Sequence, residues 1–216
     1  MKVVLVHAFP LDERMWEPQL GALPGHELST PSLYDLGGNS IEVWAGRILE
    51  QVEGELAVVG ASVGGYVGLA MARREPDRVR GLLLAGARAG ADSPERRAGR
   101  DEAIRTVREE GIDAWAPSAP APPPPERTVD ELVRTLEALR DRPDATDVVE
   151  SFPGPLWIAV GDADPFLPLD EARELFSLAR NGRLEVFEGA GHFTNMQQPE
   201  RFNELLGEFV ESASRS

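Results

Sequence analysis

The sequence predicts an α/β fold, in which helices flank a mainly parallel sheet. Two observations predict this class. Short apolar runs alternate along the chain with amphipathic segments of helical period, which is typical of parallel strands joined by crossover helices. The chain has 216 residues, 42% of them hydrophobic, which is enough for one large domain with a substantial core.

In the first half of the chain, four apolar runs predict strands and the segments between them predict helices. Asn39-Ser40 is a helix cap, and Glu75-Pro76-Asp77 ends the last of these helices. The predicted strands are residues 3–6, 28–30 (a weak one), 56–59 and 79–86. The predicted helices are residues 12–23, 40–52 and 62–74.

The alternation stops for about 60 residues after the fourth strand. Ser93-Pro94 predicts a helix start, and Thr128 with Glu131 forms a capping box for a second helix. The proline-rich stretch between them, residues 116–125, is expected to be extended, with neither helix nor inner strand. Strands at 155–161 and 183–189 and helices at 169–180 and 199–211 then resume the pattern.

Composition excludes several classes of function. The net charge of −15 argues against a nucleic-acid partner, because phosphate contacts need a basic surface. No run approaches the roughly 18 apolar residues of a membrane span, and no signal-peptide pattern is evident. The absence of cysteine excludes disulfides, thiol catalysis and thiolate metal sites. We therefore expect an acidic protein of the cytoplasm with no membrane span.

Ser62 lies in Gly60-Ala61-Ser62-Val63-Gly64, between a predicted buried strand and a predicted helix. A serine nucleophile on a sharp strand-to-helix turn needs small neighbours two residues to either side, because the backbones approach closely. The glycine-rich fingerprints of phosphate-binding loops do not match this stretch. Ser62 is therefore the candidate nucleophile, and the alternative is a serine in a plain glycine-rich turn.

A serine nucleophile needs a base and an acid that orients the base. Of the three histidines, His192 directly follows a predicted strand in a glycine-rich loop, whereas His26 is expected at the surface and His7 ends the first strand. Asp162 and Asp164 both follow the strand at 155–161. Either carboxylate can serve as the acid, and the carboxyl ends of parallel strands meet at one sheet edge.

With these residues in place, the chain resembles the α/β-hydrolase superfamily over nearly its whole length. It is most similar to the lid-bearing esterases, enol-lactonases, C–C hydrolases and perhydrolases. Four motifs carry the resemblance: VHAFPLDERMW at 6–16, VGASVGG at 59–65, VGDADPFLP at 160–168 and GAGHFTNMQQPERF at 189–202. The order Ser62, Asp164, His192 matches the order of the triad in this superfamily.

The resemblance implies further roles. It assigns the acid to Asp164, with Asp162 as second choice, and makes His7 a structural residue. The oxyanion donors it implies are the backbone N–H groups of Phe9 and Val63. Ala8 stands where the family usually has glycine, which restricts the backbone of that loop.

The resemblance also implies the domain organisation. Residues 1–90 and 151–216 are expected to form the core, and residues 91–150 a helical, proline-rich lid. Since the chain starts on the strand that feeds the oxyanion loop, we expect about six strands, without the family's first hairpin. The predicted pocket residues are Trp115, Phe166, Leu167 and Phe193.

The function that follows is hydrolysis of small to medium, mostly neutral carboxylic esters through an acyl-enzyme. Lactone opening, C–C bond hydrolysis and perhydrolysis use the same triad and remain alternatives. An alternative of another class is a small-molecule receptor without turnover. We expect no cofactor and no metal, because the histidines lack ligand spacing. The oligomeric state stays open between monomer and homodimer.

Overall fold

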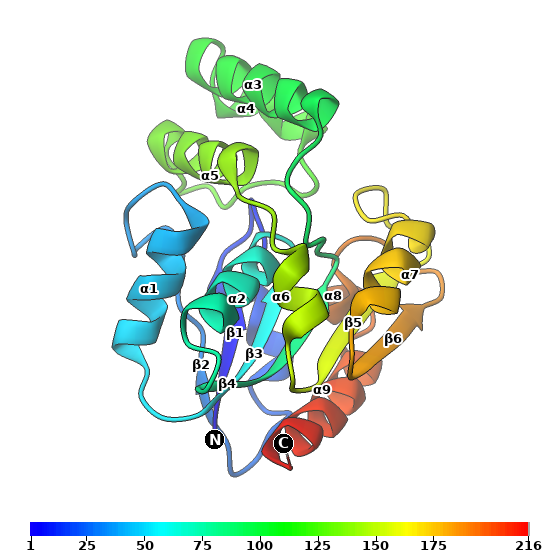
Figure 1. Ribbon diagram of the computed structural model, residues 1–216. Coiled ribbons are helices and arrows are strands. Elements are labelled where there is room, and N and C mark those ends of the chain that lie inside the picture. Colours follow the sequence, from blue (N-terminus) through cyan, green and yellow to red (C-terminus); the bar gives the residue numbers. More distant parts are fainter. Residues whose placement is uncertain (216) are drawn as a thin grey trace.

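The computed structural model describes residues 1–215, which contain one six-stranded sheet (Figure 1). The strand order is β2-β1-β3-β4-β5-β6, and every neighbouring pair is parallel. The predicted α/β class and the sheet of six strands are thereby confirmed. The strands are β1 (Lys2–Val6), β2 (Glu27–Ser29), β3 (Leu56–Ala61), β4 (Val79–Ala85), β5 (Leu156–Gly161) and β6 (Gly182–Phe187).

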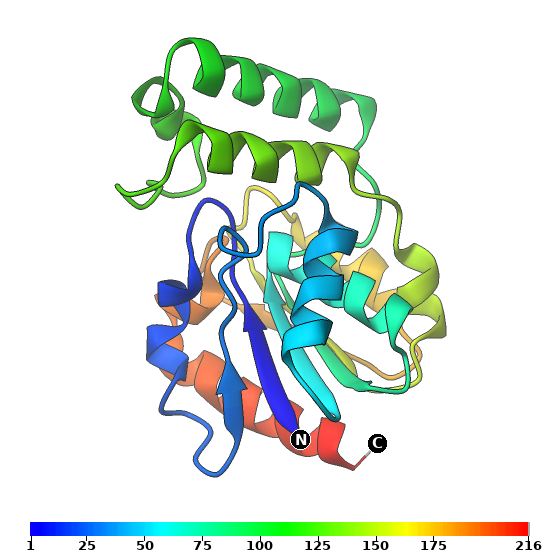
Figure 2. The ribbon, with the colours of Figure 1, turned by 90° about the vertical axis from the view of Figure 1, so that its left-hand side faces the viewer.

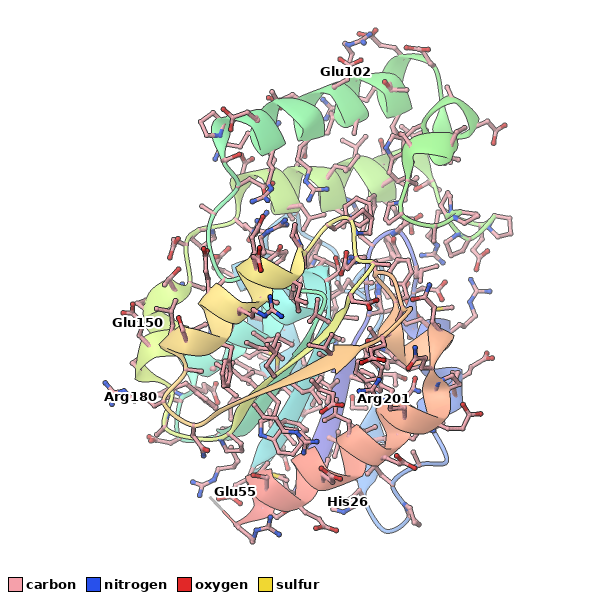
Figure 3. All side chains as sticks on the ribbon, turned by 90° about the vertical axis from the view of Figure 1, so that its right-hand side faces the viewer. His26, Glu55, Glu102, Glu150, Arg180 and Arg201 are labelled. Carbon is pink, nitrogen blue, oxygen red and sulfur yellow. The ribbon has the colours of Figure 1, made fainter. Side chains whose placement is uncertain are left out.

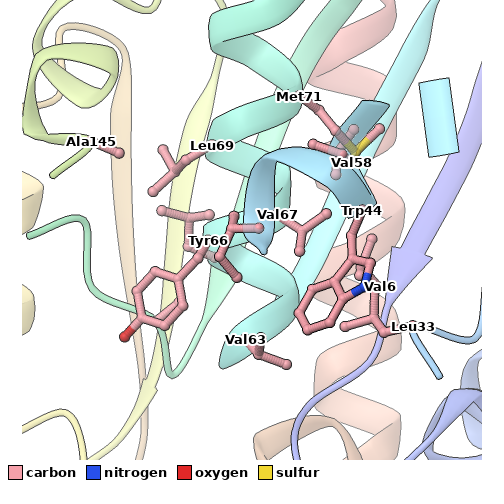
Figure 4. Close-up of a cluster of buried hydrophobic side chains, with 14 of the residues drawn as sticks. Val6, Leu33, Trp44, Val58, Val63, Tyr66, Val67, Leu69, Met71 and Ala145 are labelled. Atoms are coloured by element: carbon pink, nitrogen blue, oxygen red, sulfur yellow. The ribbon is translucent and has the colours of Figure 1, made fainter. Parts of the chain in front are cut away.

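Helices cover both faces of the sheet, because successive strand residues point to opposite sides. Val4 and Val6 of β1 belong to one buried cluster, and Val3 and Leu5 to the other. The first cluster lies beneath helices α1, α2, α6 and α7, and Figure 4 shows part of it, with Trp44 of α1 near Val6. These helices are α1 (Ile41–Gln51), α2 (Val63–Arg74), α6 (Thr146–Ser151) and α7 (Leu169–Leu178).

The second face is covered by the closing helix and two short segments (Figure 2). These are η1 (Glu13–Gln19), α8 (Thr194–Gln197) and α9 (Pro199–Ser214). The prediction of a helix over 12–23 was wrong in extent and type, since η1 is a 3-10 helix of seven residues that contains Pro18. Proline lacks the N–H that a longer α-helix would need at that position.

A pair of helices stands above the carboxyl ends of the strands (Figures 1 and 2). We call residues 94–141 the helical insertion; it contains α3 (Pro94–Glu109), α4 (Ile112–Trp115), the 3-10 turn η2 (Ala116–Ser118) and α5 (Val129–Asp141). Ser93 caps α3, and Thr128 with Glu131 forms the predicted capping box of α5. The expectation that 116–125 contains no helix was wrong for η2, because Pro117 occupies a position in the first turn, where the missing N–H costs nothing.

Candidate active site

Ser62 occupies a strained turn between β3 and α2. Its φ is +50°, and among residues 1–215 no other residue except glycines has a positive φ. Such a conformation costs about 1–3 kcal/mol and persists only where the surroundings enforce it. The Ser62 N–H donates to the carbonyl of Ala85 (2.8 Å), and the Gly65 N–H donates to the carbonyl of Ser62 (3.0 Å). The sheet and the helix therefore hold the strained residue from both sides.

The glycines around Ser62 are required by close backbone contacts. A Cβ added at Gly60 would lie 2.2 Å from the carbonyl oxygen of Gly64, and one added at Gly64 would lie 2.1 Å from that of Val6. No side chain fits at such distances. The Gly-x-Ser-x-Gly spacing thus has the steric cause that the sequence suggested.

His192 and Asp164 come together at the same sheet edge. His192 Nδ1 lies 2.8 Å from Oδ2 and 3.0 Å from Oδ1 of Asp164. Because a carboxylate only accepts, Nδ1 carries the proton, and Nε2 is left to face another partner. The Asp164 side chain is fully buried, and its Oδ1 also accepts the N–H groups of Phe166 (2.8 Å) and Leu167 (3.1 Å).

Asp162 has a different partner, although it follows the same strand. Its Oδ1 accepts the N–H of Gly189 at 2.7 Å. This bond ties the loop after β5 to the loop that carries His192. Of the two carboxylates that the sequence left open, the structure brings Asp164 to His192.

Ser62 and His192 both line a cavity of about 540 Å³, a size typical of small-molecule sites. The cavity is lined by the sheet edge, the loop after β5 and the helical insertion, and Phe9, Trp115 and Phe166 are among its apolar lining residues. The Phe9 and Trp115 ring centroids are 5.4 Å apart. The insertion therefore meets the loop after β1 directly over the cavity.

Leu167 and Phe193, predicted as pocket residues, are not part of the cavity lining. Leu167 is buried in the core cluster beneath α7. Phe193 lies beside His192, with ring centroids 5.0 Å apart, and packs toward the cluster on the opposite face of the sheet. Both side chains support the loops that carry Asp164 and His192.

The two residues expected to supply the oxyanion donors lie in different segments, Phe9 in the loop after β1 and Val63 directly after Ser62. Val63 is the first residue of α2, so its N–H has no acceptor within the helix. Phe9 belongs to the loop after β1 and lines the cavity together with Ser62. Val63 is thus next to Ser62 in the chain and Phe9 is in the cavity lining; their role as oxyanion donors stays a prediction.

The other two histidines lie outside the cavity lining. His7 is buried, its Nε2 accepts the N–H of Leu33 (2.9 Å), and its Nδ1–H donates to the carbonyl of Ala8 (3.0 Å). Burial lowers the pKa of His7. His26 is exposed, at the end of the molecule opposite Glu102 of α3 (Figure 3).

Several lining residues were missed by reasoning from the sequence. Gly86, after β4, makes room for the His192 ring, since a Cβ there would lie 3.0 Å from Nδ1. Arg96 and Arg100 line the cavity from α3, and Arg88 from the loop after β4. The spacing of Arg96, Arg100 and Ala103 places them on one helix face, but which face of α3 meets the cavity depends on tertiary packing that the sequence does not show.

The described part of the chain offers neither an obvious metal site nor a membrane span. Residues 1–215 contain no cluster of three or more histidine, aspartate or glutamate side chains that could hold a metal ion. Within the same residues, no helix combines the length and apolarity needed to cross a bilayer.

Comparison with known proteins agrees with this architecture. A thermophilic esterase from Thermogutta terrifontis, solved with malate bound, superposes with a TM-score of 0.88 at 27% identity, over 99% of this chain and 90% of that one. An enol-lactonase from Burkholderia xenovorans LB400 shares the fold, with a TM-score of 0.83 at 21% identity, over 97% of this chain and 90% of that one.

Curated relatives are similar in sequence as well. A pimeloyl-[acyl-carrier protein] methyl ester esterase from Neisseria meningitidis serogroup B is 26% identical over 99% of this chain and 94% of its own length. A 2-hydroxymuconate semialdehyde hydrolase from Pseudomonas sp. strain CF600 is 28% identical over 80% of this chain and 69% of its own length. The model of the alpha/beta hydrolase family matches residues 3–205. The chain therefore belongs to the α/β-hydrolase family.

Proposed function

We propose that the protein hydrolyses carboxylic esters through an acyl-enzyme formed on Ser62. One observation carries the proposal: Ser62, held in a strained turn, shares a cavity with a histidine whose Nδ1 is bonded to a buried carboxylate. A nucleophile, a base and a group that orients the base are the parts that acyl transfer requires.

In the first half-reaction, His192 Nε2 takes the proton of the Ser62 hydroxyl as Oγ attacks the ester carbonyl. Asp164 holds the imidazole in the required tautomer and stabilises the imidazolium. The tetrahedral intermediate collapses, and the alcohol leaves with the proton from His192. Water, deprotonated by His192, then attacks the acyl-enzyme, and the acid departs as Ser62 regains its proton.

The oxyanion of both tetrahedral intermediates is proposed to be held by the N–H groups of Phe9 and Val63. Val63 is suited to this role because the N-terminus of a helix carries unsatisfied N–H groups and a partial positive charge. Loss of one such donor typically costs about 3–4 kcal/mol of transition-state stabilisation.

The helical insertion is proposed to act as the lid of this site. Trp115, Leu136 and Leu139 line the cavity from the insertion, and Phe9 and Phe166 line it from the core. These apolar side chains favour a small to medium ester with an apolar acyl group. The named relatives act on different substrates, so none of their substrates is assigned to this chain.

The test is a panel of esters and lactones of graded acyl length, assayed with the wild type and Ser62→Ala. Ser62-dependent turnover of short p-nitrophenyl esters, lowered at least about 10⁴-fold in Ser62→Ala, is the expected result. Preference for lactones or C–C substrates would move the reaction to one of the alternatives. A single stoichiometric modification without turnover would indicate a receptor, and full activity in Ser62→Ala would refute the assignment.

A further inference from the structure

The wall of the cavity that faces the sheet edge from the helical insertion is cationic. Arg96 and Arg100, one turn apart on α3, line this wall, and Arg88 lines the cavity from the loop after β4. The protein as a whole has a net charge of −15. The sign of the charge on these arginines in the cavity lining is therefore opposite to that of the protein as a whole.

These arginines are only partly neutralised. Asp92 is shared between Arg142, whose Nη2 lies 2.7 Å from Oδ1, and Arg100, whose Nε donates to Oδ2 at 3.3 Å. Glu171 of α7 is likewise shared between Arg88 and Arg96, the latter at 2.9 Å. Four guanidinium groups thus share two carboxylates, which leaves two positive charges in excess. Glu102 also lines the cavity, and it shares Arg105 with Glu109 and Glu110. Even when the whole charge of Glu102 is counted, one positive charge remains in excess.

Both lining arginines of α3 keep donors available. Arg100 bonds to Asp92 through Nε alone, and Arg96 bonds to Glu171 through Nη2 alone. Within residues 1–215, the other N–H groups of these two guanidinium groups have no hydrogen-bond partner in the structure. The two side chains are 32% and 39% exposed, so a ligand in the cavity can reach them.

We propose that the cavity takes esters that carry a carboxylate remote from the ester bond, and that Arg96 and Arg100 bind this carboxylate. The proposal rests on the proposed esterase function. The guanidinium fork matches a carboxylate, and Trp115, Leu136 and Leu139 provide an apolar lining for the intervening chain. One negative charge fits better than two, because the acidic protein repels dianions more strongly.

This proposal revises an expectation from the sequence. The sequence predicted mostly neutral substrates, from the acidic overall charge and from the apolar residues expected in the pocket. The alternative role of Arg96 and Arg100 is purely structural, since their ion pairs also tie α3 to Glu171 and Asp92. If their role is purely structural, substitution of Arg96 or Arg100 should not change the preference between anionic and neutral esters. This expectation distinguishes a structural role from a role in binding the carboxylate.

The test compares methyl hydrogen suberate, a monoanion, with methyl octanoate, its uncharged counterpart of equal chain length. We expect the wild type to have the higher kcat/KM for the monoanion. Arg96→Gln and Arg100→Gln should each lower the ratio of the two kcat/KM values by roughly tenfold. The change should fall mainly on KM, because the carboxylate is bound equally in the ground and transition states.

Arg108→Gln is the matched control, since it removes the same charge from α3 at a residue outside the cavity lining, and its partner Glu137 also lies outside that lining. It should leave the ratio unchanged, whereas added salt should reduce it in the wild type. A pair with the charge on the alcohol, 6-acetoxyhexanoate and hexyl acetate, shows which side of the ester carries the carboxylate. A preference in either pair that depends on Arg96 and Arg100 supports the proposal.

Failure of this proposal is distinguishable from failure of the esterase function. If neutral and anionic esters are cleaved with a ratio that Arg96→Gln and Arg100→Gln leave unchanged, the arginines only fasten α3 and the proposal is overturned. If no ester is cleaved, the esterase function fails. Calorimetric binding of methyl hydrogen suberate against methyl octanoate to Ser62→Ala then tests the anionic subsite alone, and equal affinities overturn it.

Discussion

Arg142 and Asp92 form an ion pair that is buried on both sides: Nη2 lies 2.7 Å from Oδ1, and each side chain is 1% exposed. Asp92 precedes α3 and Arg142 follows α5, so the pair joins the two connections of the helical insertion to the core. The Arg142 guanidinium also lies over the Tyr66 ring, 4.1 Å from its centroid, and Tyr66 lines the cavity. The ion pair that attaches the insertion to the core thus contacts Tyr66, a residue of the cavity lining.

Asp92→Asn should destabilise the protein by about 3 kcal/mol or more, because the loss of one partner leaves Arg142 as an uncompensated buried charge. The free energy of unfolding from urea denaturation measures this. Asp141→Asn is the control, since its partners Arg97 and Arg140 are partly exposed and such pairs contribute about 1 kcal/mol or less. Equal losses in the two variants would contradict a special role for the buried pair.

Asp164→Asn should lower kcat for a short ester by about 10⁴-fold, because an amide facing Nδ1 favours the wrong imidazole tautomer. Asp162→Asn should cost far less, since the amide oxygen can still accept the N–H of Gly189. Steady-state kinetics of both variants, with circular dichroism to check folding, decide the point. A larger loss in Asp162→Asn would move the acid role to that residue.

The parts of the site that the sequence could predict depend on local signals. Ser62 was found because Gly60 and Gly64 bracket it between a buried strand and a helix, and the six strands because their apolar runs are short and well bounded. The residues alone could not separate Asp162 from Asp164, because both follow β5 and only a contact with another loop distinguishes them; the assignment to Asp164 came from the resemblance. Catalysis by the chosen residues stays a prediction.

The cationic wall could not be seen in the sequence for a different reason. Arg96 and Arg100 belong to a helix that is polar on most sides, and such a pattern usually indicates a solvated surface. Which side faces the cavity is set by the packing of α3 on α5 and by the position of both above the sheet (Figure 2). That arrangement depends on tertiary contacts, which the periodicity of one helix does not contain.

Gly64→Ala should destabilise the protein by about 1–3 kcal/mol or more and lower esterase activity, because the new Cβ would lie 2.1 Å from the Val6 carbonyl oxygen. The strain would move α2 away from β1 and displace Ser62. Gly207→Ala is the control: nothing lies within 4 Å of its Cβ position in α9, so it should stabilise by about 0.5–1 kcal/mol. Thermal unfolding of both variants measures the contrast, and an unchanged melting temperature in Gly64→Ala would contradict it.

His7 should make the stability of the protein depend on pH below about pH 6.5. Burial lowers its pKa from the ordinary value of 6.5, and protonation of Nε2 would break its bond from the Leu33 N–H. The unfolded chain therefore binds the proton more readily than the folded one, so this stability is fully present above about pH 6.5 and is lost as the pH falls toward the folded pKa.

The measurement is the free energy of unfolding of the wild type and His7→Gln between about pH 8 and pH 5, the range that brackets the ordinary histidine pKa. His7→Gln should be less stable at pH 8, because the Leu33 and Ala8 bonds are altered in a buried site. Its deficit should shrink toward pH 5, where the wild type loses the contribution of neutral His7. A deficit that stays constant over this range would show that the pKa of His7 is the same in the folded and the unfolded chain, and it would contradict the lowering by burial.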